Sequence, residues 1–240
     1  MWTDVVDLRD FYASPLGGAA SRTLRGRMRA LWPDLGGGRM LGIGYATPYL
    51  RAFRDDAAAI AAVMPAGQGV LHWPPDGPGQ SLLADEAELP FADNLFDRVL
   101  LVHALEFSEQ WRRMMREVWR VMAGGGRLLV LVPNRRGLWA QLERTPFGRG
   151  QAFTPAQLSR LLRETLFVPL RTQPGLYMLP TKSRLARATA PAWERLGERY
   201  MRGVGGVFMI EAGKQLYAGH PEAARARRRR RVVAPMPSRS

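Results

Sequence analysis

A histidine and a glutamate three residues apart, His103 and Glu106, form the clearest acid–base pair in the sequence. They directly follow a run of apolar residues that predicts a buried strand. In open α/β sheets, ligands bind on the side where such strands end. An imidazole beside a carboxylate is suited to proton transfer. The same pair is also a common local support within a fold, so no catalytic residue is assigned from the sequence.

A second polar cluster, Asn134, Arg135, Arg136 and Trp139, follows the next predicted strand. Arginine forms paired hydrogen bonds to carboxylate and phosphate groups, so the cluster is suited to holding an anionic substrate. Arginine and tryptophan are also enriched where proteins contact each other. The cluster is therefore predicted to be a substrate surface or a protein-binding surface.

Other kinds of chemistry find little support. The chain has no cysteine, which excludes disulfides, thiolate metal sites and a cysteine nucleophile. Its three histidines, His72, His103 and His220, are scattered and do not have the spacing of metal ligands, so no metal is expected. There is no phosphate-binding loop and no nucleophile elbow.

Length and composition indicate a globular α/β protein. At 240 residues with 46% hydrophobic residues, the chain fits one such domain with small additions. We expect a helical extension at 1–37, the α/β domain at 38–220 and an arginine-rich tail at 221–240. The start of the chain does not resemble a signal peptide, and no apolar run is long enough for a membrane span, so a cytoplasmic location is expected.

The formal net charge is +14, yet of the 35 basic residues only Lys182 and Lys214 are lysines. This arginine preference is typical of a compositional bias. Nucleic-acid binding is a possible interpretation of the charge, but no recognition motif accompanies it. Membrane binding by the basic N-terminal helix is set aside in favour of packing on the domain itself, through Leu24, Met28 and Leu31.

Strand and helix signals alternate along the chain, which predicts a doubly wound, mainly parallel sheet. Predicted strands cover 39–44, 69–73, 81–85, 97–103, 127–132, 167–179 and 207–217, and predicted helices cover 47–64, 108–122, 154–165 and 180–201.

Two segments carry a resemblance to a known family. Residues 89–106 read LPFADNLFDRVLLVHALE and residues 40–50 read MLGIGYATPYL. Together they resemble class I S-adenosylmethionine-dependent methyltransferases of the type 11 group. The resemblance implies a Rossmann-like sheet of the seven-stranded type with S-adenosylmethionine as cofactor. It also implies that the last strand pairs antiparallel with the strand-like segment before it. The residues that it would assign to the cofactor are Gly42, Gly44, Ala46, Asp85, Glu86 and His103.

The glycine-rich segment departs from the family pattern. The family's opening acid falls on Gly42, the first glycine is kept as Gly44, and the next two become Ala46 and Pro48. The family also ends its second strand with a carboxylate, but here the predicted second strand ends in His72-Trp73. These departures predict weak or absent binding of S-adenosylmethionine.

Two functions remain open. The segments LGIGYATPYL and VPNRRGLW resemble bacterial methyltransferase-like proteins associated with glyoxalase II, hydroxyacylglutathione hydrolase. That resemblance implies a pseudo-methyltransferase that binds and modulates a partner enzyme. The alternative is an active methyltransferase that acts on a small molecule.

Overall fold

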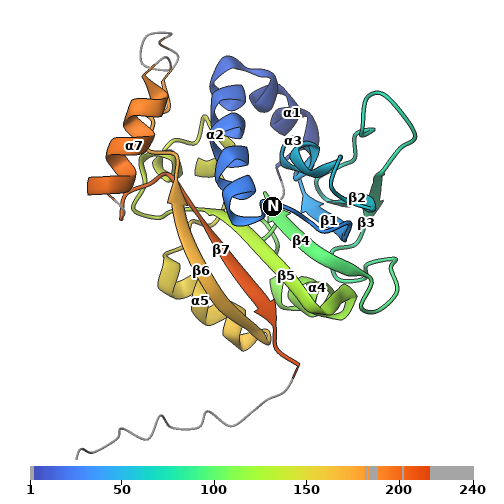
Figure 1. Cartoon of the computed structure of the whole chain (residues 1–240). Coiled ribbons are helices and arrows are strands. Elements are labelled where there is room, and N and C mark those ends of the chain that lie inside the picture. The colour runs from blue at the N-terminus through green and yellow to red at the C-terminus, as the bar shows by residue number, and fades with distance from the viewer. Residues whose placement is uncertain (1–2, 182, 184–188, 202, 217–240) are drawn as a thin grey trace, which may run out of the picture.

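The computed structural model describes residues 3–181, 183, 189–201 and 203–216. Its strands are β1 Arg39–Gly44, β2 Ala59–Pro65, β3 Ser81–Ala84, β4 Phe96–Val102, β5 Met122–Pro133, β6 Phe167–Gly175 and β7 Val207–Lys214. They form one sheet in the order β3-β2-β1-β4-β5-β7-β6 (Figure 1). Neighbouring strands from β3 to β5 pair in parallel, whereas β7 is antiparallel to both β5 and β6. The predicted fold class is therefore confirmed, including the antiparallel last strand.

Helices cover both faces of this sheet. They are α1 Val5–Ala13, α2 Pro15–Leu31, α3 Thr47–Leu50, α4 Trp111–Val121, α5 Pro155–Glu164 and α7 Ala190–Tyr200. Short 3-10 turns occupy Arg51–Phe53, Leu138–Gln141 and Pro146–Gly148. None of the described helices is long and apolar enough to cross a membrane.

The sheet separates two hydrophobic cores. Met115 and Val118 of α4 pack with the residues of β4 and β5 that point to one face, and α5 joins them there. Leu24 and Met28 of α2 pack against the opposite face (Figure 1). The central strands are buried on both sides, which explains their continuous apolar sequences.

The predicted stripe of α2 is confirmed, because Leu24 and Met28 are fully buried. Ser14 separates α1 from α2, and its hydroxyl accepts a hydrogen bond from Gly17 N as the N-cap of α2. Both helices pack on the sheet domain, so the segment predicted as an extension forms part of its core. The arginine-rich tail predicted at 221–240 lies outside the described residues.

Two predicted elements are wrong. The long helix predicted at 47–64 ends after one turn, and its second half is β2. The strand predicted at 69–73 is irregular. Alanine-rich sequence favours a helix in isolation, but residues 59–65 are enclosed between β1 and β3, and this tertiary pairing overrides the local preference.

The boundaries around α4 also differ. The helix begins at Trp111 and not at Ser108, and the three glycines expected to end it, 124–126, already belong to β5. Within the helix predicted at 180–201, α7 covers Ala190–Tyr200, while residues 182 and 184–188 lie outside the described residues.

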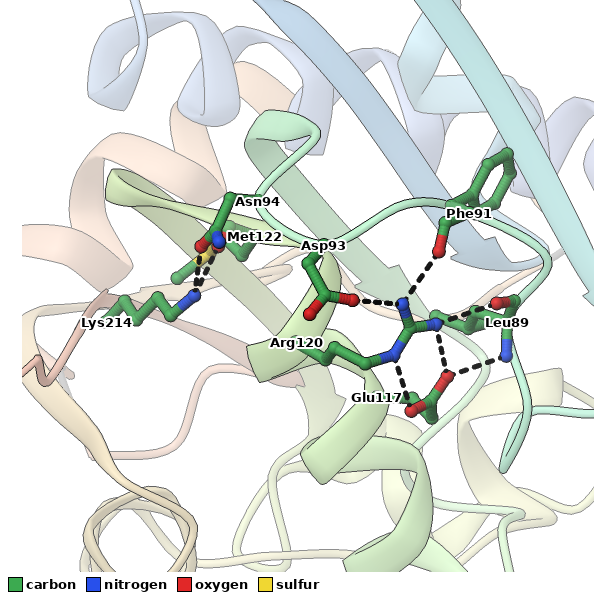
Figure 2. A network of polar contacts seen from close by, with 8 residues as sticks. All are labelled: Leu89, Phe91, Asp93, Asn94, Glu117, Arg120, Met122 and Lys214. Carbon is green, nitrogen blue, oxygen red and sulfur yellow. Dashed lines mark hydrogen bonds and ion pairs between the residues drawn. The ribbon is translucent and has the colours of Figure 1, made fainter.

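The loop between β3 and β4 is fixed by one arginine of α4. The guanidinium of Arg120 donates to the carbonyl oxygens of Leu89 and Phe91 and forms ion pairs with Asp93 and Glu117 (Figure 2). Hydrogen bonding to Glu117 is the main reason that the pKa of Arg120 is raised, and the same bond lowers the pKa of Glu117. The LPF segment is thus held in place by α4, because Arg120 binds two of its carbonyl oxygens.

A lysine near the end of β7 makes a second tie in the same region. Lys214 Nζ donates to Asn94 Oδ1 and to the carbonyl oxygen of Met122, each at 2.7 Å (Figure 2). The ammonium also lies 4.0 Å from the ring centroid of Trp119. Burial lowers the pKa of Lys214. This lysine therefore joins the antiparallel end of the sheet to the loop before β4.

Candidate functional site

The order of the strands reverses between β1 and β4. In open α/β sheets ligands bind outside the carboxyl ends of the strands at this reversal. Here the space beyond Gly44 of β1 and Val102 of β4, the switch-point site, contains His103. The structure therefore places His103 where the sequence predicted a ligand-binding face.

The switch-point site is filled by α1 of the same chain. The phenol oxygen of Tyr12 lies 2.8 Å from His103 Nε2 and 2.9 Å from the phenol oxygen of Tyr49. The ring of Tyr12 stacks on that of Tyr45, the residue after β1, with centroids 5.5 Å apart. On its other side His103 Nδ1 lies 3.2 Å from Glu106 Oε1.

One arrangement of protons gives each of these contacts a donor. Burial raises the pKa of Tyr12 well above its ordinary value and also raises that of Tyr49, so both phenols keep their protons. Tyr49 then donates to Tyr12, Tyr12 donates to His103 Nε2, and Nδ1–H of His103 donates to Glu106. The second carboxylate oxygen of Glu106 is buried with no hydrogen-bond partner among the described residues.

The backbone around this chain of contacts is also closely fitted. His103 has a φ of 50°, an uncommon value for a residue other than glycine. Its carbonyl oxygen accepts a hydrogen bond from Gln68 Nε2 at 3.1 Å. A Cβ added to Gly44 would come within 2.3 Å of the carbonyl oxygen of Val102. Gly44 is therefore required by the approach of β4 and not by a ligand.

Apolar residues complete the packing beneath α1. Val5 and Leu8 of α1 form a buried cluster with Tyr45 and with Met64 near the end of β2. The start of α1 is fixed by a hydrogen bond from Val5 N to the carbonyl oxygen of Gln68 at 2.8 Å. Helix α1 is thus bound to the ends of β1, β2 and β4 together.

The residues present do not fit S-adenosylmethionine at the switch-point site. At Gly42, where the family has an acid, even a Cβ would lie 2.7 Å from Ala46 Cβ and from Leu50 Cδ1. The correct second strand ends in Met64-Pro65, and neither residue has the carboxylate that would accept hydrogen bonds from a ribose. The prediction that the second strand ends in His72-Trp73 was wrong, because β2 covers Ala59–Pro65.

The other residues assigned to the cofactor are not gathered around His103. Asp85 is exposed, and its Oδ1 accepts a hydrogen bond from Ala87 N in a local turn. Glu86 is buried, 3.4 Å from the hydroxyl of Ser108. The structure brings Gly42, Gly44 and Ala46 close to the site, but as packing against α3 and β4.

The cluster after β5 is divided between surface and core. Arg135 and Arg136 are exposed, but Asn134 is buried and donates to the carbonyl oxygens of Gly203 and Gly205. Trp139 was expected on the surface and is 1% exposed, with its indole N–H donating to the carbonyl oxygen of Met178. The prediction for Trp139 is wrong because the loop folds back under residues 175–178.

Sequence reasoning missed Tyr12, Tyr49 and Gln68. The helical spacing of Val5, Leu8 and Tyr12 was a signal that α1 buries one face. It contained no information on the surface against which that face packs.

Comparisons with known proteins agree with this architecture. Residues 29–130 match the family described as methyltransferase domain. Over 130 residues the chain is 28% identical to the demethylmenaquinone methyltransferase of Corynebacterium glutamicum, covering 54% of this chain and 56% of that protein. The chain thus spans about half the length of the curated relatives it matches.

Solved structures extend the likeness to most of the chain. A methyltransferase from Thermotoga maritima has a TM-score of 0.62 at 18% identity and covers 88% of this chain and 96% of its own. The 1,6-didemethyltoxoflavin-N1-methyltransferase of Burkholderia thailandensis has a TM-score of 0.53 at 17% identity, with 88% of each chain covered. The [4+2]-cyclase SpnF has a TM-score of 0.53 at 22% identity and covers 82% and 81%. The chain therefore has the class I methyltransferase fold, and its residues 29–130 match the methyltransferase domain family.

Proposed function

We propose that this protein binds another protein and does not use S-adenosylmethionine at the switch-point site. The observation that supports the proposal is the position of Tyr12, which stacks on Tyr45 and is hydrogen-bonded to His103 where a cofactor of this fold would lie. A fold does not by itself fix an activity, and function has to be argued from the site.

The energetic cost of opening the site supports the proposal. A ligand in this place would have to displace α1, including the fully buried Leu8. Exposing one such leucine costs about 1.5–3 kcal/mol. Leaving the buried His103 without its hydrogen bond to Tyr12 would add roughly 1–3 kcal/mol. Because each 1.4 kcal/mol is about a tenfold change in affinity, a cofactor would bind several orders of magnitude more weakly than at an open site.

The proposed partner is hydroxyacylglutathione hydrolase, on the basis of the sequence resemblance described above. The exposed Arg135 and Arg136 offer two cations for a protein contact at the carboxyl ends of the strands. On the α1 side, a cavity of about 590 Å³ lies between Phe11 and the loop of Arg144 and Arg149. Either feature would give the partner a contact without opening the switch-point site.

Calorimetry tests the cofactor half of the proposal. The full chain is titrated with S-adenosylmethionine and with S-adenosylhomocysteine, and a demethylmenaquinone methyltransferase serves as the positive control. We expect a dissociation constant of about 1 mM or higher, which corresponds to a binding free energy of roughly 4 kcal/mol at most. A dissociation constant in the low micromolar range would overturn the proposal.

Size-exclusion chromatography of the two purified proteins tests the partner half. We expect a complex with hydroxyacylglutathione hydrolase that weakens about tenfold or more in the R135E/R136E variant. The matched variant R51E/R163E changes the same number of exposed arginines and should leave the complex intact. If no complex forms, or if both variants weaken it equally, this partner and this surface are wrong.

An active methyltransferase acting on a small molecule is the second candidate. It is favoured by the match of residues 29–130 to the methyltransferase domain family and by the names of the relatives. This function requires α1 to leave the switch-point site during the reaction. Tight cofactor binding in the calorimetric experiment would support it.

A further inference from the structure

A second hollow, separate from the switch-point site, lies between α4 and the end of α5. It encloses about 330 Å³, and its walls include Trp111, Arg112, Arg116, Trp119, Glu164 and Leu166. A volume of this size is within the range of pockets that hold small organic molecules. None of the residues named at the switch-point site contributes to it.

Aromatic and cationic groups alternate on the outer side of α4. Arg112, Arg116 and Trp119 are spaced at i, i+4 and i+7, so they lie along one face of the helix. The guanidinium carbon of Arg112 lies 4.1 Å from the ring centroid of Trp111. The segment 111–120 thus interleaves aromatic rings and cations along one helix.

The cations of this hollow are available to an anion. Neither Arg112 nor Arg116 forms an ion pair or a side-chain hydrogen bond with any residue that the structure describes, and both are exposed. The one carboxylate in the wall, Glu164, is paired with Arg160 at 2.9 Å. The hollow therefore has two arginines without a directly paired carboxylate, and Arg116 also borders a neighbouring pocket lined by Asp85, Glu88 and Glu117.

The indole of Trp119 provides an unused donor. Its Nε1–H is buried and has no acceptor among the described residues, although buried polar groups are normally hydrogen-bonded. The ammonium of Lys214 lies against the ring of Trp119 and supports it. A ligand that enters far enough to bring an acceptor atom to this buried nitrogen would satisfy the donor.

A leucine in a strained conformation forms part of the wall. Leu166 has a φ of 65° directly after α5, a position at which glycine is usually found. Its side chain is nevertheless 49% exposed. A bulky residue with positive φ has an energetic cost, and such residues gather at binding sites.

We propose that this hollow binds a nucleotide unit, with the base against the tryptophan rings and the phosphate on Arg112 and Arg116. Stacking on aromatic rings together with arginine contacts to phosphate is the general means of holding unpaired nucleotides. The same chemistry is offered by a free nucleotide and by single-stranded nucleic acid. The overall charge of +14 favours either as a ligand over a cation or a neutral metabolite.

The experiment uses the full chain and two probes, AMP and a fluorescein-labelled oligothymidylate of about 15 nucleotides. Binding is measured by the quenching of tryptophan fluorescence and by anisotropy, each at two salt concentrations. We expect the R112E/R116E variant to lose about tenfold or more in affinity. The matched R22E/R51E variant reverses two exposed arginines away from the hollow, makes the same change in net charge and should stay within about twofold of the wild type.

A second variant, Trp119→Phe, keeps a smaller aromatic ring against Lys214 and removes the indole N–H together with part of the stacking surface. We expect it to weaken binding by roughly fivefold or more, the equivalent of one lost hydrogen bond. Displacement of the oligonucleotide by AMP would assign the hollow to a free nucleotide, and binding of the oligonucleotide alone would assign it to a nucleic acid. Equal losses in the two charge-reversed variants, or no binding of either probe, would overturn the proposal.

Discussion

The phenol oxygen of Tyr12 lies 2.8 Å from Nε2 of His103, although the two residues are 91 positions apart in the sequence. The contact joins the first helix to the end of β4 at the point where the strand order reverses. A residue of the protein itself therefore lies where ligands of open α/β sheets bind. The histidine is held on its other side by Glu106, so the contact is part of a continuous polar chain through a buried region.

We expect Tyr12→Phe to lower the free energy of unfolding by about 1–3 kcal/mol. The variant keeps the ring but leaves the buried His103 Nε2 and the Tyr49 hydroxyl without their partner. Urea unfolding measures the effect. The matched variant Tyr200→Phe removes a phenol that is 68% exposed and should change stability by less than about 0.5 kcal/mol. Equal, small effects of both substitutions would show that the contact contributes nothing.

Gly42→Asp introduces the acid that the family resemblance expects. We expect the variant to be less stable by about 2 kcal/mol or more and to gain no affinity for S-adenosylmethionine, because a Cβ at this position would lie 2.7 Å from Ala46 and Leu50. Thermal unfolding and calorimetry measure the two effects. Gly26→Asp, where a Cβ meets nothing within 4 Å, is the matched control and adds the same charge. A gain of cofactor binding in Gly42→Asp would contradict the description of a filled site.

The ion pair between Glu117 and Arg120 predicts a pH dependence of stability. The pKa of Glu117 is lowered in the folded protein, chiefly by its hydrogen bond to Arg120. Its contribution is therefore fully present above the pKa of the unfolded chain, about 4.3, and is lost as the pH falls through the lower folded pKa. We expect the wild type to lose more stability than Glu117→Gln between about pH 5 and pH 3. Parallel curves of the unfolding free energy against pH would contradict this assignment.

Trp139 is buried and Arg136 is exposed, so truncating the two side chains should have different effects on the free energy of unfolding. We expect Trp139→Ala to destabilise the protein by about 3–5 kcal/mol, because the ring is buried and its N–H is hydrogen-bonded to Met178. The exposed Arg136→Ala should change stability by less than about 0.5 kcal/mol. Chemical denaturation measures both. A stable Trp139→Ala variant would restore the view that this tryptophan belongs to the surface.

The sequence by itself determined the class of fold. The strands predicted at 39–44 and 207–217 and the buried stripe of α2 follow from hydrophobic periodicity and turn residues, which are local properties, whereas the antiparallel end of the sheet was implied by the family resemblance. The misassigned segment 59–65 shows the limit of this reasoning. Its alanines favour a helix, and only the neighbouring strands β1 and β3 supply the pairing that makes it β2.

The tertiary structure alone decided what occupies the switch-point site and which side chains face solvent. Tyr12 and His103 meet because α1 folds over the ends of the strands, and Trp139 is buried because residues 175–178 cover it. On α4, the rings and arginines form a hollow only because the end of α5 provides its other wall. Such contacts depend on the relative placement of distant elements. Local periodicity shows which residues are apolar, but it does not specify which distant surface each of them meets.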